Sequence, residues 1–232
     1  MKQLSSTLYA NRLFYYGSLF FMAVAAAIVI FFSKPEGFIL LNYHHSVALN
    51  IFFVNYTFLG DGIFALALVA FLFYRKQRKL ALLVLAAYLT SGITAQLLKN
   101  IIYAPRPRIY FEAGQYIYHL DNFGDSGGGA SSFPSGHTTS AFAIATVCAL
   151  WWQKNRLSIL LVAAAALVGY SRIYLAQHFM TDVLAGSCIG IFFGTVSFLV
   201  FNSQKEYRFF KKRKLHQPVS NWNNAFPGTA IS

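Results

Sequence analysis

Six apolar runs divide the sequence, and each approaches the length needed to cross a bilayer. A transmembrane segment needs about 20 apolar residues. An apolar run of this length is expected to be helical, because a helix satisfies its own backbone amides where the bilayer core holds no water. We therefore predict six transmembrane helices, of which the fourth is short and the third contains Ser, Thr and Gln. The predicted spans cover residues 14–32, 57–74, 80–102, 138–153, 157–175 and 182–201.

The expected fold class is all-α, and the protein is expected to be a polytopic membrane protein. The composition agrees, because 56% of the residues are hydrophobic and only 11% are charged, with a mean hydropathy of +0.49. Residues 1–202 are expected to form one membrane domain whose first span remains as an uncleaved anchor. Residues 203–232 are expected to form a basic cytoplasmic tail. The one long loop, residues 103–133, is a candidate functional segment because long loops more often carry function than fill space.

The basic residues are distributed unevenly between the two sides of the predicted bundle. If six spans alternate in direction, one side holds 14 of the 19 Lys and Arg residues. By the positive-inside rule, both termini are therefore cytoplasmic, and the loop between spans three and four is extracytoplasmic. The extracytoplasmic side holds only Lys34, Lys99, Arg106, Arg108 and Arg172.

The net charge of +12 is explained by this membrane topology, so we expect no nucleic-acid partner. The tail sequence KEYRFFKKRKLHQ has two interpretations. It is either the topology anchor, which we favour, or a contact with anionic lipids.

Unusual residues gather at the extracytoplasmic ends of the predicted spans. The segment KNIIYAPRPR closes the third span, with Lys99 on its last helical turn. Pro105 must end the helix before Arg106, and the following proline favours an extended backbone at Arg106. Lys99 has an alternative interpretation as a charge that snorkels to the interface. That interpretation is weak for an arginine held between two prolines.

The tetrad Pro-Ser-Gly-His, residues 134–137, stands directly before the fourth span. Its simplest interpretation is a helix start in which Ser135 is the cap. A helix start is also a natural anion site, since its backbone N–H groups point outward. Gly136 would then let the backbone approach an anion closely, and His137 could transfer a proton.

The segment SRIYLAQHFMTD, residues 171–182, links the fifth and sixth spans. His178 and Asp182 lie four residues apart, so they share one face of the opening turn of span six. A carboxylate in that position can fix the tautomer of an imidazole and stabilise its protonated form. The alternative is a His–Asp pair that only caps the helix.

Taken in order, the three clusters resemble the three-part signature of the type-2 phosphatidic acid phosphatase superfamily. This superfamily includes membrane lipid phosphatases, glucose-6-phosphatase and soluble vanadium haloperoxidases. The resemblance covers residues 99–182, and the six spans agree with the integral-membrane branch. The matching pattern is Lys99-x6-Arg106-Pro107, Pro134-Ser135-Gly136-His137 and Ser171-Arg172-x5-His178-x3-Asp182.

The resemblance implies a phosphatase that works through a phosphohistidine. It assigns His178 as the nucleophile on phosphorus, Asp182 as its orienting partner, and His137 as the general acid and then the base. The remaining residues are expected to bind phosphate, since cationic forks, hydroxyls and helix-start amides suit its oxygens. They are Lys99, Arg106, Ser135, Gly136 and Arg172.

Metal and cofactor chemistry are not expected. Two-metal phosphatases need several oxygen ligands, and the seven acidic residues show no paired spacing. The expected substrate is a lipid phosphate or pyrophosphate held at the membrane surface. Candidates are undecaprenyl pyrophosphate, phosphatidic acid, phosphatidylglycerol phosphate and the 1-phosphate of lipid A.

Two other functions are compatible with parts of the pattern. A lipid phosphotransferase would pass the phosphoryl group to an acceptor lipid instead of water. A transporter is a weaker candidate because its charges would lie near the middle of the bilayer, whereas these gather at one interface. The expected location is a bacterial inner membrane. The sequence predicts no particular oligomeric state.

Overall fold

The computed structural model describes residues 2–113, 118, 120 and 131–215. Much of the predicted long loop and the last part of the predicted tail, residues 216–232, lie outside the described residues. The described chain is helical, apart from short links and one isolated antiparallel bridge between Pro105 and Ser131.

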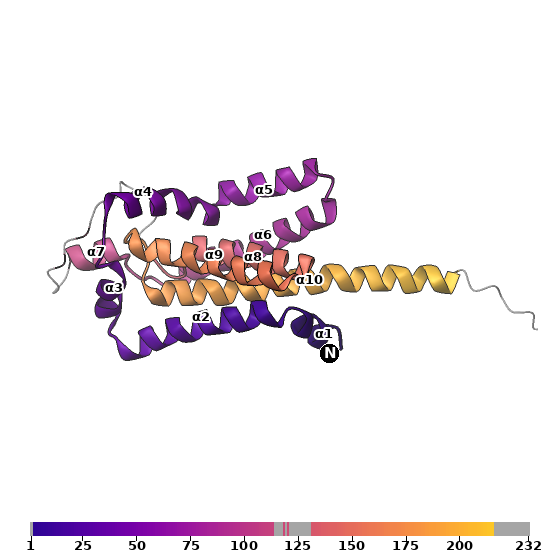
Figure 1. Ribbon diagram of the computed structural model, residues 1–232, viewed down its shortest axis with the longest axis horizontal. Coiled ribbons are helices and arrows are strands. Elements are labelled where there is room, and N and C mark those ends of the chain that lie inside the picture. Colours follow the sequence, from indigo (N-terminus) through magenta and orange to yellow (C-terminus); the bar gives the residue numbers. More distant parts are fainter. Residues whose placement is uncertain (1, 114–117, 119, 121–130, 216–232) are drawn as a thin grey trace, which may run out of the picture.

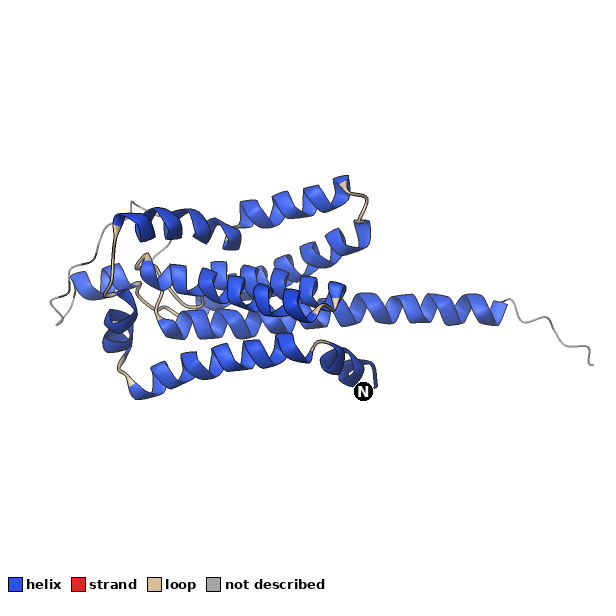
Figure 2. Cartoon of the chain, in the orientation of Figure 1, coloured by secondary structure: helices blue, strands red, loops and turns tan. Residues whose placement is uncertain are grey.

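Apart from the link between α7 and α8, the helices follow one another through short connections, as Figure 2 shows. Their bounds are α1 Lys2–Ala10, α2 Arg12–Phe31, α3 Lys34–Asn42, α4 Val47–Tyr56, the 3-10 helix η1 Thr57–Gly60, α5 Gly62–Tyr74, α6 Arg78–Ile101, α7 Pro107–Glu112, α8 Gly136–Trp152, α9 Asn155–Tyr174 and α10 Met180–Leu215.

Four helices are long and apolar enough to cross a membrane, judged by length and composition. They are α2, α6, α9 and the segment Met180–Phe201 of α10. A fifth candidate is formed if α3 and the following α4–η1 segment, bent by 113°, count as one span. The all-α membrane fold expected from the apolar runs is therefore present, with four to five candidate spans among the described residues.

The predicted span 57–74 is not one continuous helix. It divides at Asp61, whose carboxylate accepts a hydrogen bond from the Ile63 amide at 2.7 Å and so caps α5. The preceding segment 33–56, for which no helix was predicted, forms α3 and α4. Asn, Asp and Ser compete for backbone hydrogen bonds and favour such caps over helix interiors.

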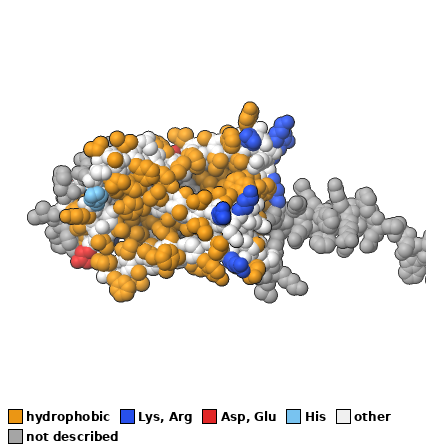
Figure 3. Space-filling view, viewed as in Figure 1, with side chains coloured by type: hydrophobic (Ala, Val, Ile, Leu, Met, Phe, Trp, Pro, Cys, Tyr) orange, Lys and Arg blue, Asp and Glu red, His pale blue; other side chains and the backbone are white. Residues whose placement is uncertain are grey.

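The helices run between two ends of an elongated bundle (Figure 1). Helices α3 and α7 lie at one end, whereas α1 and the junction of α5 with α6 lie at the other, where α10 extends beyond the bundle. Apolar side chains cover the middle of the visible face in Figure 3, and Lys and Arg gather near the second end. The exposed basic residues at the α5–α6 and α8–α9 junctions are Arg75, Lys76, Arg78, Lys154 and Arg156.

Helix α8 forms the centre of the bundle and is buried from Thr138 to Leu150. It packs directly against α10 through three glycines of α10 spaced by four residues. A Cβ atom at Gly186 would lie 2.7 Å from the Ser135 carbonyl oxygen, and one at Gly194 would lie 2.7 Å from Thr146 Cβ. Small residues at this spacing let two helix backbones approach closely within a membrane.

The tightest of these contacts makes a stability prediction. A Cβ atom at Gly190 would lie 2.5 Å from the Thr139 carbonyl oxygen and 2.8 Å from Phe142 Cβ. We expect Gly190→Ala to destabilise the protein by about 1–3 kcal/mol, as overpacking does. Gly92→Ala is the matched control, because a Cβ atom there would meet nothing within 4 Å. The melting temperatures of both variants in detergent test this; equal stability would contradict the close α8–α10 contact.

Candidate active site

The tetrad at residues 134–137 forms the start of α8, and this start is fastened to α10. The Ser135 hydroxyl accepts a hydrogen bond from the Thr138 hydroxyl at 2.9 Å and a longer one from the Thr138 amide at 3.4 Å. The Ser135 amide donates to the Asp182 carbonyl oxygen at 3.0 Å. The cap interpretation of Ser135 is therefore confirmed, and the cap also fixes α8 beside the first turn of α10.

Gly136 is the first residue of α8, and its missing side chain leaves open space. A Cβ atom there would meet nothing within 4 Å, so packing does not demand the glycine. The space lies at a helix start, where unpaired amides and the helix dipole attract anions. The position is suited to a ligand that approaches the backbone closely.

The turn that ends α9 explains the spacing between Arg172 and His178. The chain leaves the helix through Ala176, which adopts a left-handed conformation with φ 53°. The amides of Gln177 and His178 both donate back to the Arg172 carbonyl oxygen, at 2.9 and 3.1 Å. Carbonyl groups at a helix end are commonly satisfied by such a turn. The five intervening residues thus place His178 just beyond the end of α9, the helix that carries Arg172.

Asn42 braces this turn from α3. Its side-chain amide donates to the carbonyl oxygens of Ile173 and Tyr174 at 2.9 and 2.8 Å. The Asn42 backbone carbonyl in turn accepts from the Tyr118 hydroxyl at 3.0 Å. Both bonds to α9 are buried, where hydrogen bonds resist competition from water. The turn that leads to His178 is therefore held both by its own hydrogen bonds to Arg172 and by Asn42 of α3.

His178 and Asp182 form a buried pair, as the four-residue spacing predicted. His178 Nδ1 lies 3.4 Å from Asp182 Oδ2, and the two residues are 2% and 1% exposed. The same carboxylate oxygen accepts from the Phe179 amide at 2.9 Å. The Ser132 hydroxyl donates to it as well and lies 3.2 Å from His178 Nδ1. With Nδ1 facing the carboxylate, Nε2 is the nitrogen that carries the lone pair.

Burial lowers the pKa of His178 to about 4, although the hydrogen bond to Asp182 opposes that shift. A buried imidazole without full charge compensation favours its neutral form. His178 is therefore neutral at pH 7, and a neutral imidazole is the form that can act as a nucleophile.

Three cations surround the histidines. Lys99, on the last turn of α6, donates to the carbonyl oxygens of residues 131 and 132 at 3.2 and 3.3 Å. Arg106 caps α7 in the extended conformation expected from its proline neighbours and donates to Gln177. Burial lowers the pKa of Arg106, and the charge of Asp182 opposes that shift.

Arg172 is the most buried of the three, with 6% exposure. One of its terminal nitrogens donates to the Thr57 hydroxyl at 2.7 Å, whereas its Nε is buried without a hydrogen-bond partner among the described residues. A buried unsatisfied donor on a charged group is costly. An anionic ligand would satisfy it.

The eight residues predicted to form the site come together at one end of the bundle. Electrostatic interactions connect His137 with Arg172, His178, Arg106 and Lys99. Ser135 and Gly136 precede His137 directly, and Asp182 contacts both His178 and the Ser135 backbone. Among the described residues, no three His, Cys, Asp or Glu side chains are grouped as metal ligands.

Asp61 is a site residue that was missed in the sequence. Its Oδ2 lies 3.7 Å from His137 Nε2 while its other oxygen caps α5. Gly60 makes this approach possible, because a Cβ atom there would lie 2.7 Å from the His137 carbonyl oxygen. The available signal was an acid between two glycines, LGDG, inside an apolar run. Ser132 and Thr57 gave no comparable signal.

Known proteins resemble this chain over the same region. Phosphatidylglycerophosphatase B of Bacillus subtilis is 30% identical over 179 residues, covering 71% of this chain and 80% of that protein. A lipid A 4'-phosphatase of Porphyromonas gingivalis is 30% identical over 144 residues, covering 60% of each. The crystal structure of Aquifex aeolicus LpxE superposes with a TM-score of 0.61 at 33% identity, covering 72% of this chain and 96% of that one.

The chain spans 60% or less of the length of the lipid A phosphatases that it matches. A family model described as the PAP2 superfamily matches residues 80–206, more than half of the chain. That segment contains all three clusters that build the site, from Lys99 to Asp182. The chain therefore belongs to the PAP2 superfamily, as its three-part signature predicted.

Proposed function

We propose that this protein hydrolyses a phosphate from a lipid head group through a phosphohistidine on His178. The observation that carries the proposal is the buried His178 held by Asp182 in the same site as the unsatisfied Nε of Arg172. A nucleophile and an anion-binding donor thus share one site. The relatives are named for lipid A and for phosphatidylglycerophosphate, which supports a lipid phosphate as the substrate class.

The phosphate group would be held by cations and by the start of α8. Arg172 offers its Nε, and Lys99 and Arg106 add positive charge on the same side of the histidines. Such donors neutralise charge on the oxygens of the transferring phosphoryl group, which is the main requirement of phosphoryl transfer. The open space at Gly136 would receive an oxygen close to the backbone, with Ser135 beside it.

The reaction would proceed in two displacements. First, His178 Nε2 attacks phosphorus, the bond between phosphorus and the lipid oxygen breaks, and His137 gives that oxygen a proton. In the second step a water molecule attacks phosphorus and loses a proton to His137, the phosphorus–nitrogen bond breaks, and inorganic phosphate leaves. Asp182 stabilises the positive charge on His178 while it carries the phosphoryl group, and Asp61 stabilises protonated His137.

The chain's own residues supply the nucleophile, the acid and the charge stabilisation, so the proposed reaction uses neither a metal nor another cofactor. We place the site at the extracytoplasmic face of a bacterial inner membrane. In this arrangement residues 1–202 form a six-span domain, with α5 and α8 as the two short spans. Both termini, including the basic tail 203–232, are cytoplasmic. The gathering of exposed basic residues at the end opposite the site supports this orientation (Figure 3).

Phosphate release in detergent micelles tests the proposed function. We expect release from at least one of undecaprenyl pyrophosphate, phosphatidic acid, phosphatidylglycerol phosphate and lipid A 1-phosphate. A phosphotransferase would instead produce a phosphorylated acceptor lipid with little inorganic phosphate. If neither product forms with any of the four lipids, the proposal is wrong.

Substitutions of the two histidines should cause different defects in the reaction. His178→Ala should abolish turnover and labelling by a substrate carrying radioactive phosphate. His137→Ala should slow phosphatidic acid hydrolysis by about 10²–10⁴-fold, the usual contribution of general acid–base catalysis. A pyrophosphate substrate has a better leaving group and should suffer less in the first step, so the label should accumulate on His178. Peptide mapping of acid-labile, alkali-stable label checks this; label on His137 would reverse the assignment.

Independence from metal ions predicts that activity survives chelation. Turnover measured in excess EDTA should equal turnover in buffer alone. Vanadate should inhibit, because it adopts the five-coordinate geometry of a phosphoryl group under attack. Complete loss of activity in EDTA that a divalent metal restores would contradict the mechanism.

The orientation predicts a labelling pattern for single cysteines. In a protein lacking Cys148 and Cys188, Tyr43→Cys should react with a membrane-impermeant thiol reagent added to intact cells. Gln77→Cys is the matched control at the other end of the bundle and should react only after lysis. Both positions are exposed, Tyr43 at 79%. The opposite pattern would move the site to the cytoplasmic face.

A further inference from the structure

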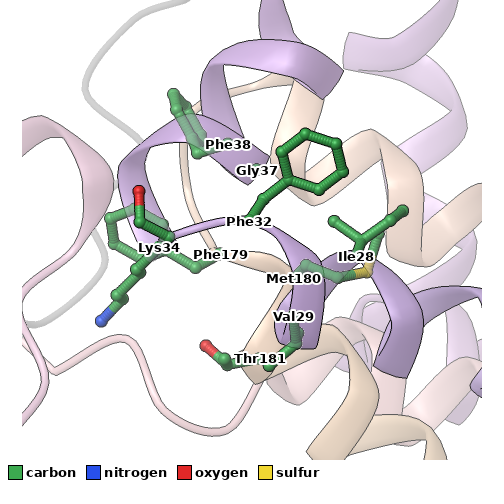
Figure 4. Close-up of a pocket in the computed structure, with 10 residues that line it drawn as sticks. Ile28, Val29, Phe32, Lys34, Gly37, Phe38, Phe179, Met180 and Thr181 are labelled. Carbon is green, nitrogen blue, oxygen red and sulfur yellow. The ribbon is translucent and has the colours of Figure 1, made fainter.

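A small cavity beside the active site takes no part in the proposed reaction. It lies between the end of α2, the start of α3 and the start of α10, and has a volume of about 110 Å³ (Figure 4). Lys34 and Thr181 contribute polar groups to its lining. Its apolar walls are Ile28, Val29, Phe32, Phe38, Phe179 and Met180.

The cavity lining includes chain neighbours of His178 and Asp182, which we call the catalytic pair. Phe179 follows His178 directly and is 1% exposed. The Thr181 hydroxyl, in the same lining, donates to Asp182 Oδ1 at 3.2 Å. Two residues of the cavity lining are therefore direct chain neighbours of the proposed nucleophile and its carboxylate partner.

Lys34 brings a positive charge to the edge of this cavity. Its Nζ lies 4.3 Å from the centre of the Phe179 ring and 6.0 Å from that of Tyr110. The nearby carboxylate of Glu36 accepts hydrogen bonds from the hydroxyl and the amide of Ser33, at 2.6 and 3.0 Å. A lysine ammonium group is attracted to the faces of aromatic rings and carries three hydrogen-bond donors. In Figure 4 its nitrogen points away from Ile28 and Phe32.

The cavity also lies beside the apolar outer surface of α2. Ile30 and Phe31, in the last turn of that helix, are 75% and 80% exposed. Exposed side chains of this kind suit contact with lipid chains in a membrane. The cavity lining thus joins residues of the lipid-facing end of α2 with Phe179 and Thr181, which neighbour His178 and Asp182 in the chain.

We propose that this cavity binds the part of the lipid that adjoins the reacting phosphate, and that Lys34 pairs with a second phosphate in the same head group. The inference rests on the proposed function and names the substrate class more closely. Apolar walls with a few placed polar groups are typical of ligand sites. Charge complementarity selects an anion for Lys34, whose ammonium group lies over the ring of Phe179 at the edge of the cavity.

Two lipids with identical acyl chains test the role of Lys34. Phosphatidylglycerol phosphate carries a terminal phosphate and an inner phosphodiester, whereas phosphatidic acid carries only the reacting phosphate. Lys34→Met keeps the length of the side chain and removes its charge. We expect it to raise KM for phosphatidylglycerol phosphate about tenfold, the loss expected for one charge-assisted hydrogen bond. KM and kcat for phosphatidic acid should stay unchanged.

Two control variants accompany this measurement. Lys34→Arg should keep the preference for phosphatidylglycerol phosphate, because it retains the charge. Arg108→Met removes an exposed cation on the same side of the bundle but outside the cavity lining, and should change neither lipid. An equal loss on both lipids in Lys34→Met would show that Lys34 acts through Phe179 on His178, and would overturn the proposal. An unchanged KM for both lipids would overturn it as well.

A second variant tests the apolar part of the cavity. Val29→Trp fills the space and should raise KM for both lipids while hydrolysis of p-nitrophenyl phosphate, which has no lipid chain, stays constant. An unchanged KM for the lipids would overturn binding of the chain in this cavity. If the unaltered protein releases phosphate from undecaprenyl pyrophosphate or lipid A 1-phosphate but from none of these three compounds, the role of Lys34 is overturned while the proposed function stands. If it releases phosphate from none of the five compounds, the proposed function itself fails.

Discussion

The close contact between α8 and α10 determines where the two histidines of the candidate site lie. Three glycines on α10 remove the side chains that would separate the two backbones, and the Ser135 amide bonds directly to the Asp182 carbonyl oxygen. Since α8 carries His137 at its start and α10 follows His178, the contact brings both histidines to the same end of the bundle. Packing in the middle of the bundle thus fixes the geometry at its end.

Burial gives the site its chemistry as well as its rigidity. His178 loses hydration and becomes neutral, whereas Asp182 keeps several hydrogen bonds that balance its burial. The buried cation Arg172 remains incompletely satisfied. Removing water strengthens electrostatic interactions, so an arriving phosphate meets donors that are already oriented. The site is complementary to an anion before one binds.

Hydropathy predicted the helices well, because long apolar runs leave few alternatives in a bilayer. Helices α2, α6, α8, α9 and α10 each begin two residues before their predicted starts, where polar first-turn residues interrupt the apolar run. The bent α3–α4 pair and the division at Asp61 were missed, since they depend on caps and on contacts between distant segments. The three site motifs could be predicted from the spacing of their residues along the chain. Ser132 and Thr57 could not be predicted, because 50 and 115 residues separate them from their partners Asp182 and Arg172.

The peripheral position of α2 and α3 has a consequence for how such a protein diverges. A substitution at Gly190 disturbs the helix pair that positions both histidines, so stability and chemistry change together. A substitution at Val29 or Phe32 alters only one wall of a cavity on outer helices. Selection can therefore act on lipid preference without first repairing the catalytic centre. Paralogues that prefer different lipids can evolve from one reaction site through substitutions in this outer wall.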